Sequence, residues 1–240
     1  GHGARIWIHA VSLGEVNATR SLVDEINRRR PDSEVVISAT TDTGYAAARR
    51  MYPEHVVFRY PLDFSWVVRR VLSRIRPTAI ILLELEVWPN LIEIAAQRGI
   101  AVCIANGRVT EAKSMRRFRK PVIRGIARRM FSRIAWTAAQ DETYAKRFIE
   151  LGVEGSRVHV VGNLKFDTAD LCETIPGADV LAEAMAIDQA RPLIVAGSTG
   201  PGEEEMILNA YKVLREKRPE LQLAVIPRNP ERFDEVARLI

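Results

Sequence analysis

The chain alternates short, nearly continuous apolar runs with longer segments in which apolar residues recur at helical spacing. One such run, Ile6–Val11, precedes a helical pattern that Pro31 stops, and another, Thr78–Leu83, precedes a helical pattern from about Trp88 to Arg98. Strands that are apolar throughout are buried on both faces, as in parallel sheets covered by helices. The alternation therefore predicts an α/β protein built on parallel sheets.

The predicted elements form two groups separated by a less regular tract. The first domain is expected to span residues 1–175, with strands at 6–11, 34–39, 55–60, 78–83, 100–105, 134–138 and 158–161. The tract 162–190 contains the linker signal Pro176-Gly177, and a new cycle of strand, glycine-rich turn and helix starts at about residue 190. Because two strands cannot easily bury a core, the second domain, residues 190–240, is expected to be truncated.

Positive charge is concentrated between Lys113 and Arg133. This segment contains nine basic residues and no acidic one, and apolar residues are interleaved at helical spacing on both sides of Pro121. Basic amphipathic helices bind anionic membrane surfaces or phosphate groups, although a solvated helix face has the same pattern. We expect a contact with an anionic membrane surface. Nucleic acid is not an expected partner, because no nucleic-acid-binding motif accompanies the charge.

Composition narrows the class of protein further. No apolar run approaches the roughly 18 residues that a membrane-spanning helix needs. The two cysteines, Cys103 and Cys172, are far apart and lack metal-ligand spacing. We therefore expect neither a zinc site nor a disulfide framework, and such sparse cysteines are typical of a reducing compartment.

The stretch Ser12-Leu13-Gly14-Glu15 joins the first predicted strand to the first predicted helix. Glu15 therefore falls on the first turn of a helix at the carboxyl end of a strand, the edge at which open α/β sheets bind ligands. Two interpretations are open. Glu15 is a candidate catalytic carboxylate, but Ser12 and Glu15 also have the spacing of a capping box, in which both side chains satisfy free backbone N–H groups.

Polar residues also follow the fourth and fifth predicted strands. Glu84 and Glu86 would share one face if the fourth strand extended that far. Paired carboxylates bind sugar hydroxyls, but Glu86 is also placed to cap the helix that starts near Trp88. Asn106 and Arg108 follow the fifth strand. The convergence of several polar loops on one sheet edge predicts a binding site there.

The glycine-rich turn Gly197–Gly202 follows the first strand of the second domain and precedes a helix. Its glycines, hydroxyl groups and helix N-terminus suit a phosphate group, although the three glutamates that follow would repel a nearby anion. The turn matches neither a Walker loop nor a dinucleotide fingerprint, so it is a weak motif by itself. Arg228, after the next strand, either binds a phosphate or carboxylate or is an ordinary surface arginine.

Taken in order along the chain, six motifs resemble those of the 3-deoxy-D-manno-octulosonic acid (Kdo) transferases of lipopolysaccharide synthesis, glycosyltransferase family 30. They are Ile8–Glu15, Glu84–Asn90, Asn106–Arg108, Gly162–Asp167, Ser198-Thr199 with Gly202-Glu203-Glu204, and Pro227–Phe233. The resemblance implies a GT-B fold, in which two Rossmann-like domains face each other across a cleft. It also implies inverting, metal-independent transfer from CMP-Kdo to a lipid A precursor at the cytoplasmic face of the inner membrane. The family often has an N-terminal membrane anchor, which would precede Gly1.

The resemblance also assigns roles to individual residues. The general base of the family falls on Glu15. The acceptor side would include Ser12, Gly14, Thr41, Thr43, Glu84, Glu86, Trp88, Asn106 and Arg108, and the donor side would include Ser198, Thr199 and Arg228. Histidines are usual in the family where this chain has Gly200 and Asn229, which affects the donor side. No metal ion or other cofactor is implied, and CMP-Kdo is a substrate.

These observations predict that Glu15 removes a proton from an acceptor hydroxyl as that oxygen attacks the anomeric carbon of Kdo. The helix N-terminus is expected to keep Glu15 ionised. The chain on its own is expected to be inactive, because motifs that complete the nucleotide pocket are absent from it. The alternatives are another GT-B nucleotide-sugar transferase and a non-catalytic lipid- or nucleotide-binding module.

Overall fold

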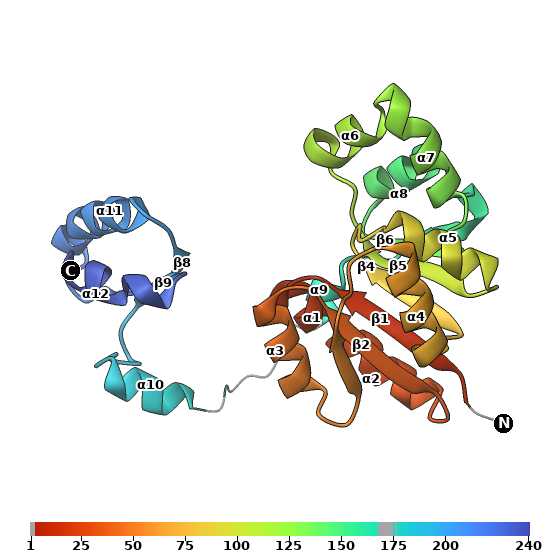
Figure 1. Ribbon diagram of the computed structural model, residues 1–240. Helices are drawn as coiled ribbons and strands as arrows, with labels where there is room; N and C mark the ends of the chain where they lie inside the picture. The colour runs from red at the N-terminus through yellow and green to blue at the C-terminus, as the bar shows by residue number, and fades with distance from the viewer. Residues whose placement is uncertain (1–2, 168–174, 176) are drawn as a thin grey trace. The chain divides into compact units, whose positions relative to one another are not determined.

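The computed structural model describes residues 3–167, 175 and 177–240 of the chain. Its internal contacts divide the chain into two compact units, residues 1–170 and 171–240, and each unit contains one parallel sheet (Figure 1). Cys172 and Pro176, two of the residues considered in the sequence, lie outside the described residues. Within the described ranges, each helix is too short or too polar to cross a bilayer.

The first unit contains a parallel sheet of seven strands with helices in the connections. Its strands are β1 (Arg5–Ala10), β2 (Glu34–Ala39), β3 (Val56–Arg59), β4 (Ala79–Leu83), β5 (Ala101–Gly107), β6 (Trp136–Ala139) and β7 (Val158–Val160). Its helices are α1 (Leu13–Ala18), α2 (Arg20–Arg29), α3 (Asp42–Met51), α4 (Ser65–Ile75), α5 (Pro89–Gln97), α6 (Arg116–Phe118), α7 (Pro121–Phe131), α8 (Glu142–Leu151) and α9 (Leu164–Asp167), with short turns η1 (Glu111–Met115) and η2 (Gly155–Arg157).

The strand order in this sheet is β3-β2-β1-β4-β5-β6-β7. The direction of the order reverses between β1 and β4, which are paired in parallel from Ile6 with Ala79 to His9 with Leu82. Such a reversal opens a crevice outside the carboxyl ends of the two central strands, and ligands bind there in open α/β sheets. The residues that follow β1 and β4 include Glu15, Glu84 and Glu86.

Two apolar cores lie on the two faces of the sheet. Because successive side chains of a strand point to opposite faces, Trp7 packs in the core that α4, α5, α7 and α8 cover, while Ile8 packs in the core beneath α1, α2 and α3. Both side chains are at most 1% exposed. Burial on both faces explains why the strands of this unit are apolar at nearly every position.

Several elements differ from the sequence prediction. The first helix is divided at Thr19, whose hydroxyl donates to the Val16 carbonyl oxygen at 2.7 Å and bonds the Tyr52 hydroxyl at 2.7 Å. The fourth strand ends at Leu83, as predicted, and Glu84 then has a φ of 54°, so Glu84 and Glu86 lie beyond the strand and do not share a strand face. The break at Thr19 arises because serine and threonine side chains compete with the hydrogen bonds of a helix.

The tract predicted to be irregular contains two short helices, α9 and α10 (Ala178–Ala184). The second unit then consists of β8 (Leu193–Thr199), α11 (Glu203–Lys217), β9 (Gln222–Pro227), a short turn η3 (Pro230–Arg232) and α12 (Phe233–Ala237). The last helix is shorter than the predicted segment, residues 231–240. Of the described residues in this unit, the buried apolar ones are Ala224 and Val236, as expected for a sheet of two strands.

Candidate active site

Glu15 lies at the carboxyl end of β1 and forms the capping box that its spacing with Ser12 predicts. One carboxylate oxygen accepts a hydrogen bond from the backbone N–H of Val11 at 2.9 Å, and the other accepts one from the Ser12 hydroxyl at 2.9 Å. The Ser12 hydroxyl oxygen in turn accepts a hydrogen bond from the Glu15 backbone N–H at 3.4 Å. A carboxylate has about four lone-pair positions, so this arrangement leaves acceptor capacity on a side chain that is only half-buried.

The environment of Glu15 affects the strength of its carboxylate as a base. Burial raises the pKa of the Glu15 carboxyl, and the nearby Glu84 carboxylate adds to the increase, whereas the hydrogen bonds from Val11 and Ser12 act in the opposite direction. The helix N-terminus favours the ionised form of this group, and burial acts in the opposite direction, with a net increase in the pKa. A higher pKa makes the carboxylate a stronger base near neutral pH.

Two further carboxyl groups face Glu15 from the loop after β4. Burial raises the pKa of Glu86 to about 7, with the charges of Glu15 and Glu84 adding to the increase and the Trp88 indole N–H opposing it. Glu84 lies 3.7 Å from the Lys165 Nζ atom, measured to its Oε1 atom. The switch point therefore holds three neighbouring carboxyl groups, of which Glu86 carries a proton for much of the time near neutral pH.

The loop that carries Glu86 is held by Asp63, a residue that the sequence analysis did not identify. The Asp63 carboxylate accepts hydrogen bonds from the backbone N–H groups of Asn90 and Leu91, each at 2.9 Å, and so caps α5. One interpretation of the sequence was that Glu86 caps this helix, but Asp63 caps it instead. Asp63 is 27 residues from Asn90, so no local capping signature marks it.

A stack of three rings lies next to this loop. Tyr60 stacks on His9 with 4.0 Å between ring centroids and lies 5.6 Å from the Trp88 ring. His9 is fully buried, and its Nδ1 atom lies 2.9 Å from the Ser38 hydroxyl, which also accepts a hydrogen bond from the Trp7 indole at 2.8 Å. Burial lowers the pKa of His9 to about 4, so the imidazole is neutral at pH 7.

The residues after β2 form the next part of the same edge. Thr41 caps α3 by accepting a hydrogen bond from the Gly44 backbone N–H at 3.1 Å, and its hydroxyl donates to the Val11 carbonyl oxygen at 3.1 Å. The Thr43 hydroxyl lies 3.4 Å from that of Thr41. Gly14 differs from Gly44, because a Cβ atom added at Gly14 would meet nothing within 4 Å. The fold itself therefore does not require a glycine at position 14.

Asn106 lies within β5, which extends beyond its predicted end to Gly107, whereas Arg108 follows the strand, and the two residues have different surroundings. The Arg108 side chain is exposed, and its Nε–H donates to the Tyr144 hydroxyl at 3.3 Å. Asn106 is 1% exposed, and its Oδ1 atom accepts a hydrogen bond from the Leu164 backbone N–H at 3.1 Å. This bond holds the segment that carries Lys165 next to Glu84, so Lys165 adds a positive charge to the site. The sequence had indicated Lys165 only as part of the motif Gly162–Asp167.

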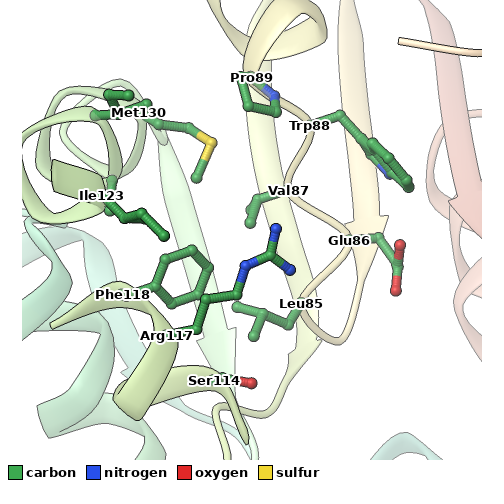
Figure 2. A pocket seen from close by; sticks show the side chains of 12 residues that line it. Leu85, Glu86, Val87, Trp88, Pro89, Ser114, Arg117, Phe118, Ile123 and Met130 are labelled. Carbon is green, nitrogen blue, oxygen red and sulfur yellow. The ribbon is translucent and has the colours of Figure 1, made fainter. Parts of the chain in front are cut away.

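The loop between β4 and α5 also lines a pocket of about 480 Å³. Figure 2 shows Glu86 and Trp88 on one side of this loop and Leu85 and Val87 on the side facing Phe118. The remaining lining residues come mainly from α6 and α7 and are Pro89, Ser114, Arg117, Ile123, Ile126, Ala127 and Met130. The basic segment predicted from the sequence thus supplies one wall of an apolar pocket beside the carboxyl groups.

The three predicted donor-side residues lie together in the second unit, at the carboxyl ends of β8 and β9. The Arg228 Nε–H donates to the Ser198 hydroxyl at 3.2 Å, and the Arg228 backbone N–H donates to the Thr199 carbonyl oxygen at 3.0 Å. The Thr199 hydroxyl donates to Glu204 at 2.8 Å, and Arg232 holds that buried carboxylate at 2.8 Å. Glu203, the first of the three glutamates that follow the turn, is exposed and accepts a hydrogen bond from the Gly200 N–H at 2.7 Å.

His, Cys, Asp and Glu side chains do not gather into a group that could hold a metal ion in the described part of the chain. The candidate site residues that the structure describes are carboxyl groups and basic or hydroxyl side chains. In the first unit these are the three glutamates at the switch point with Lys165 and Arg108. In the second unit they are Arg228 with the Ser198 hydroxyl.

Comparison with solved structures places the fold in a known class. UDP-GlcNAc 2-epimerase from Neisseria meningitidis superposes with a TM-score of 0.68 at 14% identity, covering 98% of this chain and 69% of that one. A glycosyltransferase from Rickettsia africae superposes with a TM-score of 0.64 at 10% identity, covering 100% of this chain and 65% of that one. The chain has the GT-B-type α/β fold, as predicted from the resemblance.

Sequence comparison identifies the family within this class. The profile of the family described as 3-Deoxy-D-manno-octulosonic-acid transferase (kdotransferase) matches residues 1–168. The 3-deoxy-D-manno-octulosonic acid transferase of Haemophilus influenzae is 36% identical over 236 residues, and that of Chlamydophila psittaci is 32% identical over 242 residues. The chain belongs to the Kdo transferase family. These two matches cover 98% and 100% of this chain but 54% of each relative, so the chain spans about half the length of these relatives.

Proposed function

We propose that the protein is an inverting glycosyltransferase that moves Kdo from CMP-Kdo to a lipid A precursor without a metal ion. Membership of the Kdo transferase family supports the reaction class, and the position of Glu15 at the switch point supports the mechanism. The observation that carries the proposal is the half-buried Glu15 carboxylate, whose pKa is raised by burial and by Glu84 while acceptor capacity remains on its oxygens.

In the proposed step, a hydroxyl oxygen of the acceptor sugar attacks the anomeric carbon of Kdo while Glu15 takes the hydroxyl proton. The bond between that carbon and the phosphate oxygen of CMP breaks on the opposite side, and CMP leaves with the bonding electrons. General bases contribute about 10²–10⁴ in rate. Arg228 and the Ser198 hydroxyl are proposed to bind the CMP phosphate, since a guanidinium matches phosphate geometry.

The acceptor is proposed to bind along the edge that Ser12, Gly14, Thr41, Thr43, Glu84, Glu86, Trp88, Asn106 and Arg108 form. Buried Asn106 and the capping Thr41 are proposed to act mainly by placing Lys165 and the loop after β1, because their side chains already have protein partners. We propose that Kdo transfer takes place at the cytoplasmic face of the inner membrane. The basic segment Lys113–Arg133 is proposed to bind anionic lipid there.

The substitution Glu15→Gln separates a base from a structural cap. Glutamine also completes a capping box, so its amide oxygen can keep the bond from the Val11 N–H while the basic carboxylate is removed. We expect Kdo transfer by the full-length protein to fall by about 10²–10⁴ with little change in unfolding midpoint. Retention of transfer to within about tenfold would show that Glu15 acts only as a cap.

The matched control is Ser12→Ala, which weakens the cap and leaves the Glu15 carboxylate in place. We expect it to lower the free energy of unfolding by about 1 kcal/mol, so the unfolding midpoints of the two variants separate loss of the cap from loss of the base. Supplying CMP-Kdo and a lipid A precursor to the full-length protein also tests the alternatives. Transfer of another nucleotide sugar, or binding without any transfer, would overturn the proposal in favour of a different GT-B enzyme or of a binding module.

A further inference from the structure

Three large apolar side chains are exposed beside the candidate site, on the loop after β3 and the first turn of α4. Leu62 is 72% exposed, Phe64 is 55% exposed and Trp66 is 69% exposed. No other stretch of five residues in the described part of the first unit exposes three such side chains. Single exposed apolar residues are ordinary, but a cluster of them marks an interaction site.

The loop is fixed in this conformation by the residue between two of these side chains. Asp63 points inward and accepts hydrogen bonds from the Asn90 and Leu91 backbone N–H groups, and its own carbonyl oxygen accepts one from the Asn90 side-chain amide at 2.6 Å. Leu62 and Phe64 therefore face outward on a loop that is held against the start of α5. Because α5 follows the loop carrying Glu86, the apolar cluster is tied to the catalytic edge.

The helix that continues from this cluster is basic on its outer surface. Between Phe64 and Leu83 the chain has no acidic residue, and its basic residues are Arg69, Arg70, Arg74 and Arg76, all of them exposed. Within the described residues none of these four arginines forms an ion pair, while Val68 and Leu72 on the inner side of α4 are buried. Exposed tryptophan and phenylalanine next to unpaired arginines are typical of helices that lie in the interface of an anionic lipid bilayer.

We infer that Leu62, Phe64 and Trp66 insert into the interfacial layer of an anionic lipid surface while the four arginines of α4 contact its headgroups. This inference deepens the proposed function, and it rests on that function for the identity of the membrane. The inserted cluster is separate from the segment Lys113–Arg133. Since α4 packs against α5 and α5 packs against α7, both surfaces lie on neighbouring helices of one face of the sheet (Figure 1).

The arrangement has a consequence for the acceptor. A lipid-linked sugar extends only a short way from the bilayer, so a site that acts on it must be held at the membrane surface. The Asp63 clamp ties the inserted loop to the start of α5, directly after Glu86 and Trp88, so insertion of the loop would bring this edge toward the headgroups. The apolar cluster supplies attachment that salt does not screen, whereas arginine contacts weaken as ionic strength rises.

The test measures binding of the protein to vesicles of phosphatidylglycerol and phosphatidylcholine at about 0.1 M and about 0.5 M salt, where ionic screening differs strongly. The variant carries Leu62→Ser, Phe64→Ser and Trp66→Ser. The matched control carries Trp136→Ser, Val160→Ser and Val161→Ser, three apolar residues that are 40%, 44% and 55% exposed on other strands or just after them. We expect at least tenfold weaker binding by the variant at both salt concentrations and unchanged binding by the control. Equal binding by the two proteins overturns the inference.

Fluorescence gives an independent readout of insertion. The measurement uses Trp88→Phe as its background, because Trp88 is only partly buried near the cluster. Brominated acyl chains should quench Trp66 in this bound protein, and the quenching should be largely lost when Trp66→Phe is added, because Trp7 is buried and Trp136 lies away from the cluster. Lack of quenching overturns the inference. So does a finding that the triple variant abolishes self-association in sedimentation experiments while it still binds vesicles, since a second copy of the chain would then cover the cluster.

Activity of the full-length protein separates this inference from the proposed function. With an acceptor dispersed in detergent, the triple variant should transfer Kdo at the wild-type rate, whereas with an acceptor embedded in vesicles its rate should fall along with its binding. Loss of transfer in both formats shows that the cluster serves the fold or the site and overturns the lipid role. The Glu15→Gln result is read in detergent and does not depend on vesicle binding.

Discussion

The Asn106 side-chain oxygen accepts a hydrogen bond from the backbone N–H of Leu164 at 3.1 Å across 58 residues of sequence. Asn106 has a φ of 55°, which asparagine tolerates better than most residues, and this conformation allows its amide to meet the start of α9. Leu164 packs against the core beneath α1, and Lys165 reaches Glu84. The Asn106 side-chain amide therefore connects β5 to α9, the last described helix of the first unit.

Replacing Asn106 with glycine tests how much this hydrogen bond contributes to stability. Glycine accepts the positive φ without strain, so Asn106→Gly removes the side-chain bond alone and leaves the Leu164 N–H without its partner. We expect a loss of about 1–3 kcal/mol in the free energy of unfolding and faster hydrogen exchange at Leu164. Asn163→Gly is the control, because the Asn163 side-chain bond to the Lys165 N–H is exposed and its loss should cost less.

Gly14→Ala should separate folding from ligand binding. A Cβ atom at position 14 meets nothing within 4 Å, and alanine favours a helix over glycine by about 1 kcal/mol, so the variant should be as stable as the wild type or slightly more stable. If the acceptor approaches the backbone here, the extra methyl group should raise KM for the acceptor and lower transfer at least tenfold. Unchanged kinetics would show that the space at Gly14 is not used by the acceptor.

The pH dependence of stability should report on Glu86. A carboxyl group whose pKa is raised to about 7 binds a proton in the folded protein and not in the unfolded chain between its usual pKa of 4.5 and about 7. Its contribution to stability therefore falls as pH rises through that interval. Glu86→Gln removes this contribution, so the variant should gain stability relative to wild type between pH 5 and pH 8 in urea titrations. A constant difference across that range would contradict the raised pKa.

His9 should produce the opposite slope in acid. Its pKa is lowered from 6.5 to about 4, so below pH 6.5 the unfolded chain binds a proton that the folded protein does not. Stability is lost as pH falls through that interval. We expect His9→Gln to flatten the acid limb of the stability profile between pH 6.5 and pH 4, whatever its effect at pH 7.

The second unit offers a comparison between a buried and an exposed ion pair. The Glu204 side chain is 1% exposed and the Arg232 side chain is 13% exposed, whereas those of Arg218 and Glu220 are 64% and 42% exposed. Arg232→Gln leaves a buried carboxylate without its cation, so it should lower the unfolding midpoint several-fold more than Arg218→Gln does. Equal effects would show that Glu204 is reached by water in the folded protein.

Features that depend on residues close together in the sequence were predicted, and features that depend on residues far apart in the sequence were missed. Local patterns predicted the parallel strands, most helix limits and the capping box at Ser12 and Glu15, because each depends on residues a few positions apart. The split at Thr19 was missed because its cause, the bond to Tyr52, is 33 residues away. The Asp63 clamp was missed for the same reason, whereas the predicted end of β4 at Leu83 was confirmed.

The sequence by itself determined the α/β class, the family and the position of Glu15 at a strand-to-helix junction, since apolar periodicity and short motifs carry that information. Only the tertiary structure decided which strands are neighbours, that Lys165 lies at Glu84, and that burial raises the pKa values of Glu15 and Glu86. The free energy of a charge depends on how much water the whole fold removes from around it and on which charges it brings close. Spacing along the chain specifies neither quantity.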